Sequence, residues 1–135
     1  FDAEVSSLRW FYHTFRSTAN YYESCLLRDR LLAFAKESEK SPAKVTEAKA
    51  LYAQWRKVLL DERENASASI PVMVADMRLD FYHGFGGSAA PGKAHGADVI
   101  RKKLEILETE INEFLPSLAK RCGFVLEPSE PNSHN

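Results

Sequence analysis

Residues 5–26 read VSSLRWFYHTFRSTANYYESCL, and this stretch decides the fold. Apolar or small side chains recur in it at alternating steps of three and four positions: Val5, Leu8, Tyr12, Phe15, Ala19, Tyr22 and Leu26. That spacing is typical of a stripe along one α-helix and matches the heptad spacing of paired helices. Neither glycine nor proline occurs from Phe1 to Ser41. The stretch therefore predicts a helix of about 35 residues, roughly 50 Å long.

A second set of apolar side chains widens this stripe: Phe11, Leu27, Leu31 and Phe34. The wider stripe predicts that the first helix is buried on more than one side of its axis. We expect Asp2 to cap its N-terminus. We also expect most aromatic side chains to lie in the core, because long helices need large side chains to fill the space between them.

A second helix is predicted to begin at Pro42 with Ser41 as its N-cap, because proline suits the first turn of a helix. Its apolar positions recur at helical spacing as far as Ile70. Pro71 lacks a backbone N–H and clashes with the preceding turn. We therefore expect a kink or break at residues 67–70, with a resumed helix beyond it.

Five of the six glycines lie between Gly84 and Gly96, and glycine at this density predicts a loop. Asp98 is the expected cap of a last helix, whose apolar positions run from Ile100 to Leu118 in steps of three and four. Pro116 is expected to bend this helix near its end, and Gly123 is a plausible stop.

The fold class that follows is all-α. We predict an elongated antiparallel bundle of three to four helices, with a long first helix, a second helix broken near Pro71 and a Gly-rich loop before the last helix. Residues 1–126 are predicted to form a single helical domain. Residues 127–135 are mostly polar with two prolines, and we expect this tail to be disordered.

Composition excludes several classes of function. The chain has 135 residues and a formal net charge of −1, which gives no general attraction to nucleic acid. No apolar run approaches the roughly 20 residues of a membrane-spanning helix. We therefore predict neither a nucleic-acid partner nor a membrane partner, and the cellular location stays open. Cys25 and Cys122 form no CxxC unit and are expected to be free thiols. Because the chain begins with Phe1, we expect it to be part of a longer protein.

Two patterns near the glycines resemble sites. The run Gly87-Ser-Ala-Ala-Pro-Gly92-Lys93-Ala94 matches the GxxxxGK pattern of phosphate-binding loops, but Ala94 replaces the Ser or Thr that binds Mg²⁺, and no strand precedes it. We interpret it as a connecting loop, with nucleotide binding as the third-ranked hypothesis. A possible metal or acid–base set fits no known ligand spacing: Asp76, Asp80, His83 and His95. We predict no cofactor, no metal and no catalytic residue.

The run from Asp61 to His83, DERENASASIPVMVADMRLDFYH, resembles the helical C-terminal region of large bacterial glycoside-hydrolase-like proteins. In that pattern a Glu-Asn pair precedes a proline-containing apolar segment and an Asp-Ser-Arg-Leu-Gly-Phe motif. Met77 and Asp80 depart from it, since they replace the Ser and the Gly. Two later matches extend the resemblance to about residue 118: Ile100-Arg-Lys-Lys-Leu104 and Leu115-Pro116.

The resemblance implies a non-catalytic accessory helical domain that packs on, or completes the cleft of, an upstream carbohydrate-active catalytic domain. The weak candidates for contact with a sugar are Asn65, Asp76, Arg78 and His83. No pair of carboxylates can be placed across a glycosidic bond from the sequence. The alternative hypothesis is a free-standing helical interaction or sensory module, a homodimer in which the stripe of the first helix pairs with a second copy of itself.

Overall fold

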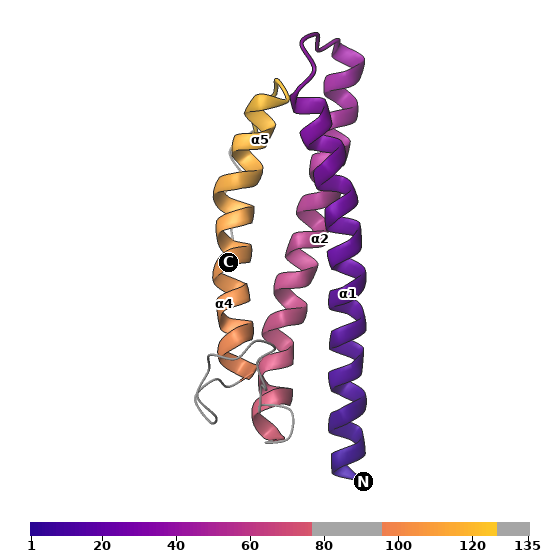
Figure 1. Cartoon of the computed structure of the whole chain (residues 1–135), viewed down its shortest axis with the longest axis vertical. Helices are drawn as coiled ribbons and strands as arrows, with labels where there is room; N and C mark the ends of the chain where they lie inside the picture. Colours follow the sequence, from indigo (N-terminus) through magenta and orange to yellow (C-terminus); the bar gives the residue numbers. More distant parts are fainter. Residues whose placement is uncertain (77–95, 127–135) are drawn as a thin grey trace, which may run out of the picture.

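The computed structural model describes residues 1–76 and 96–126, which form three long helical rods and contain no strand (Figure 1). The all-α prediction is confirmed, with three helical rods in the described part of the chain. The first two are single helices, and the third comprises two α-helical segments joined by a π-helical turn. Their bounds are α1 (Asp2–Ala35), α2 (Pro42–Ala75), α4 (Gly96–Thr109), η1 (Glu110–Phe114) and α5 (Leu115–Arg121). The predicted Gly-rich loop and the predicted disordered tail lie outside the described residues.

The three rods run antiparallel to their neighbours along the bundle (Figure 1). Residues with higher numbers on α1 contact residues with lower numbers on α2, since Ser17 contacts Glu62 and Arg30 contacts Glu47. The third rod returns along α2 in the same way, because Lys103 on α4 also meets Glu62. Near the end of the chain, Phe124 packs edge-on against Tyr52, with ring centroids 5.6 Å apart.

The hydrophobic core lies where all three rods meet, in the half of the bundle close to the α1–α2 connection. Trp55 at its centre is fully buried. The Trp55 indole N–H donates to Ser24 Oγ at 2.6 Å, and its ring packs edge-on against Phe114. The apolar stripe predicted for α2 is confirmed. It supplies much of this core: Ala48, Leu51, Tyr52, Trp55, Val58 and Leu59.

Helix ends agree only partly with expectation. Ser41 is the N-cap of α2, and its Oγ accepts the Lys44 backbone N–H at 3.4 Å. Asp2 is not a cap, since Phe1 occupies that position without a side-chain hydrogen bond. Asp98 also lies inside its helix, where it pairs with Arg101 at 2.7 Å. Both carboxylates lie in the first turn of a helix, where their negative charge interacts favourably with the positive end of the helix dipole.

The predicted break near Pro71 is wrong, because α2 continues through that proline as far as Ala75. A proline at this position leaves the Ser67 carbonyl without its helical donor. Ser67 is exposed, so water can satisfy that carbonyl. Only one turn of helix follows Pro71, which limits the free-energy cost of a proline inside the helix.

An irregularity does occur before Pro116, as a π-helical turn. The Leu115 N–H donates to the carbonyl of Glu110, five residues back, in place of the usual four. Because Pro116 has no N–H to donate, a wider turn accommodates it. Gly123 ends the last helix as predicted, with a φ of 86°, a backbone conformation that side-chain-bearing residues rarely adopt.

The burial expected for α1 is wrong over most of its length. Within the described residues α1 is covered on one side only, by α2 and the third rod (Figure 1). Leu27, Leu31 and Phe34 are buried as predicted, whereas Phe11 is 54% exposed. Most aromatic side chains of α1 are likewise at the surface rather than in the core: Phe11, Tyr12, Phe15, Tyr21 and Tyr22.

Candidate functional site

The outer side of α1 carries a continuous apolar surface, which we call the outer stripe: Leu8, Tyr12, Phe15, Ala19, Tyr22 and Leu26. Its five large side chains are each between 58 and 70% exposed. Phe11 flanks it and is also exposed, whereas the exposed Tyr21 lies toward the third rod, where it lines a small cavity. The heptad spacing recognised in the sequence is therefore real, but it faces away from the bundle. Single domains rarely expose so large a run of apolar side chains, so this surface is a candidate contact site.

The opposite side of α1 carries a second stripe with the same alternation of four and three, which we call the inner stripe: His13, Ser17, Asn20, Ser24, Leu27, Leu31 and Phe34. Its last three residues belong to the hydrophobic core. Its first four are polar and hydrogen-bond to α2. The N-terminal half of α1 thus presents polar side chains to its own bundle and apolar side chains to the outside.

Glu62 is the centre of a buried polar cluster between the three rods. It is 6% exposed. Its carboxylate accepts from Ser17 Oγ at 2.7 Å and from Asn20 Nδ2 at 2.9 Å, and it forms an ion pair with Lys103. Burial raises the pKa of Glu62, but these hydrogen bonds outweigh it and leave the pKa below its usual value. The residue therefore stays ionised and ties α1 and α4 to α2.

A second ion pair lies beside this cluster, nearer the surface. The Arg16 guanidinium holds Asp61 by two hydrogen bonds, one of them from Nε to Oδ2 at 3.0 Å. Asn20 donates to the same Asp61 oxygen at 2.8 Å. The Arg16 hydrogen bond lowers the pKa of Asp61, against the opposing effect of burial. The charge run at residues 61–64 is thus used for contacts between helices.

Asn65 is 1% exposed, and its amide is engaged by one residue. Its Oδ1 lies 2.8 Å from His13 Nδ1, and its Nδ2 donates to the His13 carbonyl at 2.9 Å. Asp76 is the C-cap of α2, and its backbone N–H donates to the Met73 carbonyl. Asn65 and Asp76 are therefore placed, but Arg78 and His83 lie outside the described residues. Sugar contact by these four residues stays a prediction.

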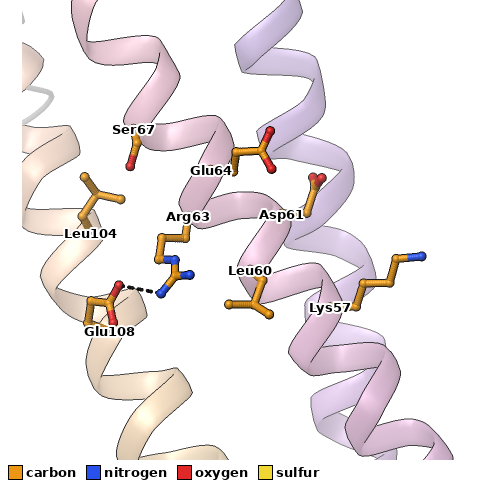
Figure 2. A pocket seen from close by; sticks show the side chains of 8 residues that line it. All are labelled: Lys57, Leu60, Asp61, Arg63, Glu64, Ser67, Leu104 and Glu108. Carbon is orange, nitrogen blue, oxygen red and sulfur yellow. Dashed lines mark hydrogen bonds and ion pairs between the residues drawn. The ribbon is translucent and has the colours of Figure 1, made fainter. Parts of the chain in front are cut away.

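A shallow groove of about 650 Å³ lies between α2 and α4 (Figure 2). The ion pair of Arg63 and Glu108 spans it, and Arg63 Nη1 donates to Glu108 Oε1 at 3.1 Å. Asp61 and Glu64 lie at its far side, where Arg16 neutralises Asp61. Its lining mixes charges of both signs with Leu60 and Leu104. Among the described residues no hydrogen bond joins Ser67, the hydroxyl side chain of the groove, to a basic side chain of its lining.

Two smaller cavities, of about 210 and 200 Å³, lie beside the buried cluster between α1, α2 and α4. Ser17 and Lys103 line both. Lys103 Nζ donates to Ser17 Oγ at 2.7 Å, a contact also seen in Ser–Lys nucleophile pairs. However, Ser17 donates its own proton to Glu62, and Lys103 pairs with the same carboxylate. Ser17, Lys103 and Glu62 thus satisfy one another, and Lys103 is not free to act as the base of such a pair.

The remaining sequence patterns add no further candidate site within the described residues. No group of three or more metal-ligating side chains occurs in residues 1–76 and 96–126. Asp80, His83, His95 and the GxxxxGK run lie outside those ranges. Cys25 and Cys122 are free thiols, as expected. None of the described helices combines the length and apolar character that a bilayer crossing needs.

The chain was also compared with known proteins. No protein-family model, curated protein or solved structure matches it. Function must therefore be argued from the geometry of the described residues, of which the outer stripe is the most distinctive part. The sequence showed the spacing of this stripe but not its exposure. The missed signal was Glu62, a charged residue within the apolar stripe of α2, which requires polar partners on a neighbouring helix.

Proposed function

We propose that this chain is a non-catalytic helical interaction module and that the outer stripe of α1 binds an α-helix of a protein partner. The observation that carries the proposal is the exposure of five large apolar side chains at strict heptad spacing. Heptad spacing keeps a seam aligned along a neighbouring helix, which a flat or irregular partner does not require.

The interior of the bundle supports a scaffold function. The polar half of the inner stripe hydrogen-bonds to Asp61, Glu62, Asn65 and Trp55 on α2. Among the described residues no buried side-chain polar atom lacks a hydrogen-bond partner. These contacts hold α1 against α2, so that α1 presents the outer stripe along one side of the bundle. Preorganisation of this kind reduces the entropy lost on binding.

An accessory domain of a carbohydrate-active protein would use the same outer stripe to pack on its catalytic domain. That prediction rests on the sequence resemblance alone, and nothing in the described residues adds a carbohydrate partner to it. The helix-binding proposal rests on exposure and spacing, and the geometry supports it better.

Binding to a designed helix tests the proposal. The probe is a synthetic amphipathic peptide with leucine at the a and d positions of four heptads, labelled for fluorescence anisotropy and titrated with the chain. We expect micromolar binding, and Phe15→Glu should weaken it at least tenfold by placing a charge in the seam.

Val99→Glu is the matched control, because Val99 is an exposed apolar residue on α4. It should bind the peptide as the parent chain does. Absence of binding by the parent chain, or equal binding by Phe15→Glu, would overturn the proposal.

A further inference from the structure

The outer stripe is almost symmetric about its own midpoint. In order, its residues are Leu8, Tyr12, Phe15, Ala19, Tyr22 and Leu26. The steps between them are four, three, four, three and four, which read the same in both directions. The residue types also mirror one another, with leucine at both ends and tyrosine next to each leucine. Only the central pair of Phe15 and Ala19 differs.

We propose that the helix bound by the outer stripe is α1 of a second copy of this chain, packed antiparallel about a two-fold axis at the middle of the stripe. This inference rests on the proposed function and names its partner. A two-fold interface uses the same surface on both copies, so that surface must be complementary to itself. The near symmetry of the outer stripe meets this condition.

The central pair selects the antiparallel orientation. In that orientation Phe15 of each copy packs against the small side chain of Ala19 of the other, so that the volumes complement each other. Leu8 meets Leu26, and Tyr12 meets Tyr22. In a parallel pair Ala19 would face Ala19 and leave a gap, while Phe15 would face Phe15 in the adjacent layer. The gap would cost free energy in proportion to its volume.

Two exposed charges beside the stripe agree with the antiparallel arrangement, and Arg16, midway between them on the same edge, is neutralised by Asp61. Arg9 and Glu23 are exposed and lie on the same edge of the outer stripe, one position after Leu8 and Tyr22. When two copies run antiparallel, equivalent edges meet, and Arg9 of each copy lies near Glu23 of the other. The two-fold axis produces this pair twice. Such pairs contribute little affinity at a surface but help to set orientation.

The area of the stripe is in the range that protein interfaces use. Because a whole aromatic side chain offers roughly 150–250 Å², the exposed fractions of the stripe and of Phe11 make about 600–800 Å² available for burial on each copy. A standard protein interface buries about 800 Å² per partner. α1 lies at the edge of the bundle, and α2 separates it from α4 in the view of Figure 1, so the other rods leave the approach to the stripe open.

Sedimentation equilibrium over a concentration series tests self-association. We expect the parent chain to form a dimer with a dissociation constant in the micromolar range. Phe15→Glu should raise that constant at least tenfold. Val99→Glu should leave it unchanged. A parent chain that stays monomeric at 1 mM would overturn self-pairing. If that monomer still bound the designed helix, the helix-binding proposal would stand, whereas loss of both would sink both.

Disulfide cross-linking tests the orientation, in a Cys25→Ser background that leaves only the buried Cys122. An equimolar mixture of Leu8→Cys and Leu26→Cys chains should form a cross-linked dimer on oxidation, because these positions meet in the antiparallel pair. Leu8→Cys alone should not. Cross-linking of Leu8→Cys with itself, or none in the mixture, overturns the antiparallel arrangement. Sedimentation of each variant first establishes that it still dimerises.

Discussion

Glu62 shows how a single buried carboxylate organises the bundle. It lies on the apolar stripe of α2, where an unpaired charge would be costly, and it recruits Ser17 and Asn20 from α1 and Lys103 from α4. Each partner comes from a helix that packs there, so the contacts specify which faces meet. The polar half of the inner stripe supplies the hydrogen bonds of this residue and its neighbours. The apolar side chains of this half of α1 lie on its outer side.

Removal of the Lys103 ammonium should destabilise the fold more than removal of its neighbour. Lys103→Met leaves the Glu62 carboxylate buried without its counter-charge, and we expect a loss of about 1–3 kcal/mol in the free energy of unfolding. Lys102→Met is the matched control, because Lys102 is 71% exposed and pairs with Glu105 in its own helix. That variant should change stability by less than about 0.5 kcal/mol. Urea unfolding at pH 7 measures both, and equal effects would contradict the role given to Glu62.

At the scale of the helices, the sequence predicted the length of each helix well, but it predicted poorly which face of α1 is buried. The absence of glycine and proline between Phe1 and Ser41 was sufficient for α1, and the Ser41–Pro42 pair was sufficient for the start of α2. The buried face of α1 could not be inferred in this way, because hydrophobic periodicity assigns apolar residues to the inside. Tyr12 and Phe15 are outside, while Ser17 and Asn20 are inside. Only the contacts of α2 reveal the reversal.

The candidate sugar-binding residues show the same limit. Asn65 was singled out by its place in a motif, yet its surroundings depend on His13, which lies 52 positions away in the chain. No local pattern encodes that pairing. The residues that matter most for the proposed surface were all recognisable from spacing, whereas their exposure depends on how three helices pack.

The proline inside α2 gives a prediction at the same scale. Pro71→Ala restores the backbone donor to the Ser67 carbonyl and removes the ring clash, so we expect the free energy of unfolding to rise by about 1 kcal/mol, less than the roughly 3 kcal/mol of a mid-helix proline. Pro42→Ala, at the first turn where proline is favourable, should not stabilise the chain. Urea midpoints of the two variants provide the comparison, and a lower midpoint for Pro71→Ala would show that the proline has a packing role.

The whole molecule should respond to pH through carboxylates with opposite environments. The pKa of Asp61 is lowered, first by the Arg16 hydrogen bond, so its stabilisation is present above the ordinary carboxyl pKa of about 4 and is lost as the pH falls through the folded value. Burial raises the pKa of Glu110 despite the nearby Arg28. Glu110 therefore opposes folding at neutral pH, and protonation relieves this effect.

Two variants separate these contributions. Asp61→Asn should destabilise the chain at pH 7, and Glu110→Gln should stabilise it. Both differences from the parent should shrink as the pH falls, and that of Glu110→Gln should shrink first, because its raised pKa is passed before the lowered pKa of Asp61. Chemical unfolding at intervals between pH 7 and pH 3 tests this behaviour. Differences of the same sign, or an Asp61→Asn difference that disappears at a higher pH than that of Glu110→Gln, would contradict the assigned environments.

The two stripes of α1 also constrain how the rod winds. A straight helix has 3.6 residues per turn, so a pattern that repeats every seven residues drifts by about 20° per heptad around its surface. The inner stripe keeps to the heptad repeat from His13 to Phe34, and the outer stripe does so from Leu8 to Leu26. When both seams are engaged, we expect α1 and its neighbours to coil around one another with a left-handed sense. A pair of copies joined through α1 would then be a continuous left-handed rope, with the two α1 helices as its central strands.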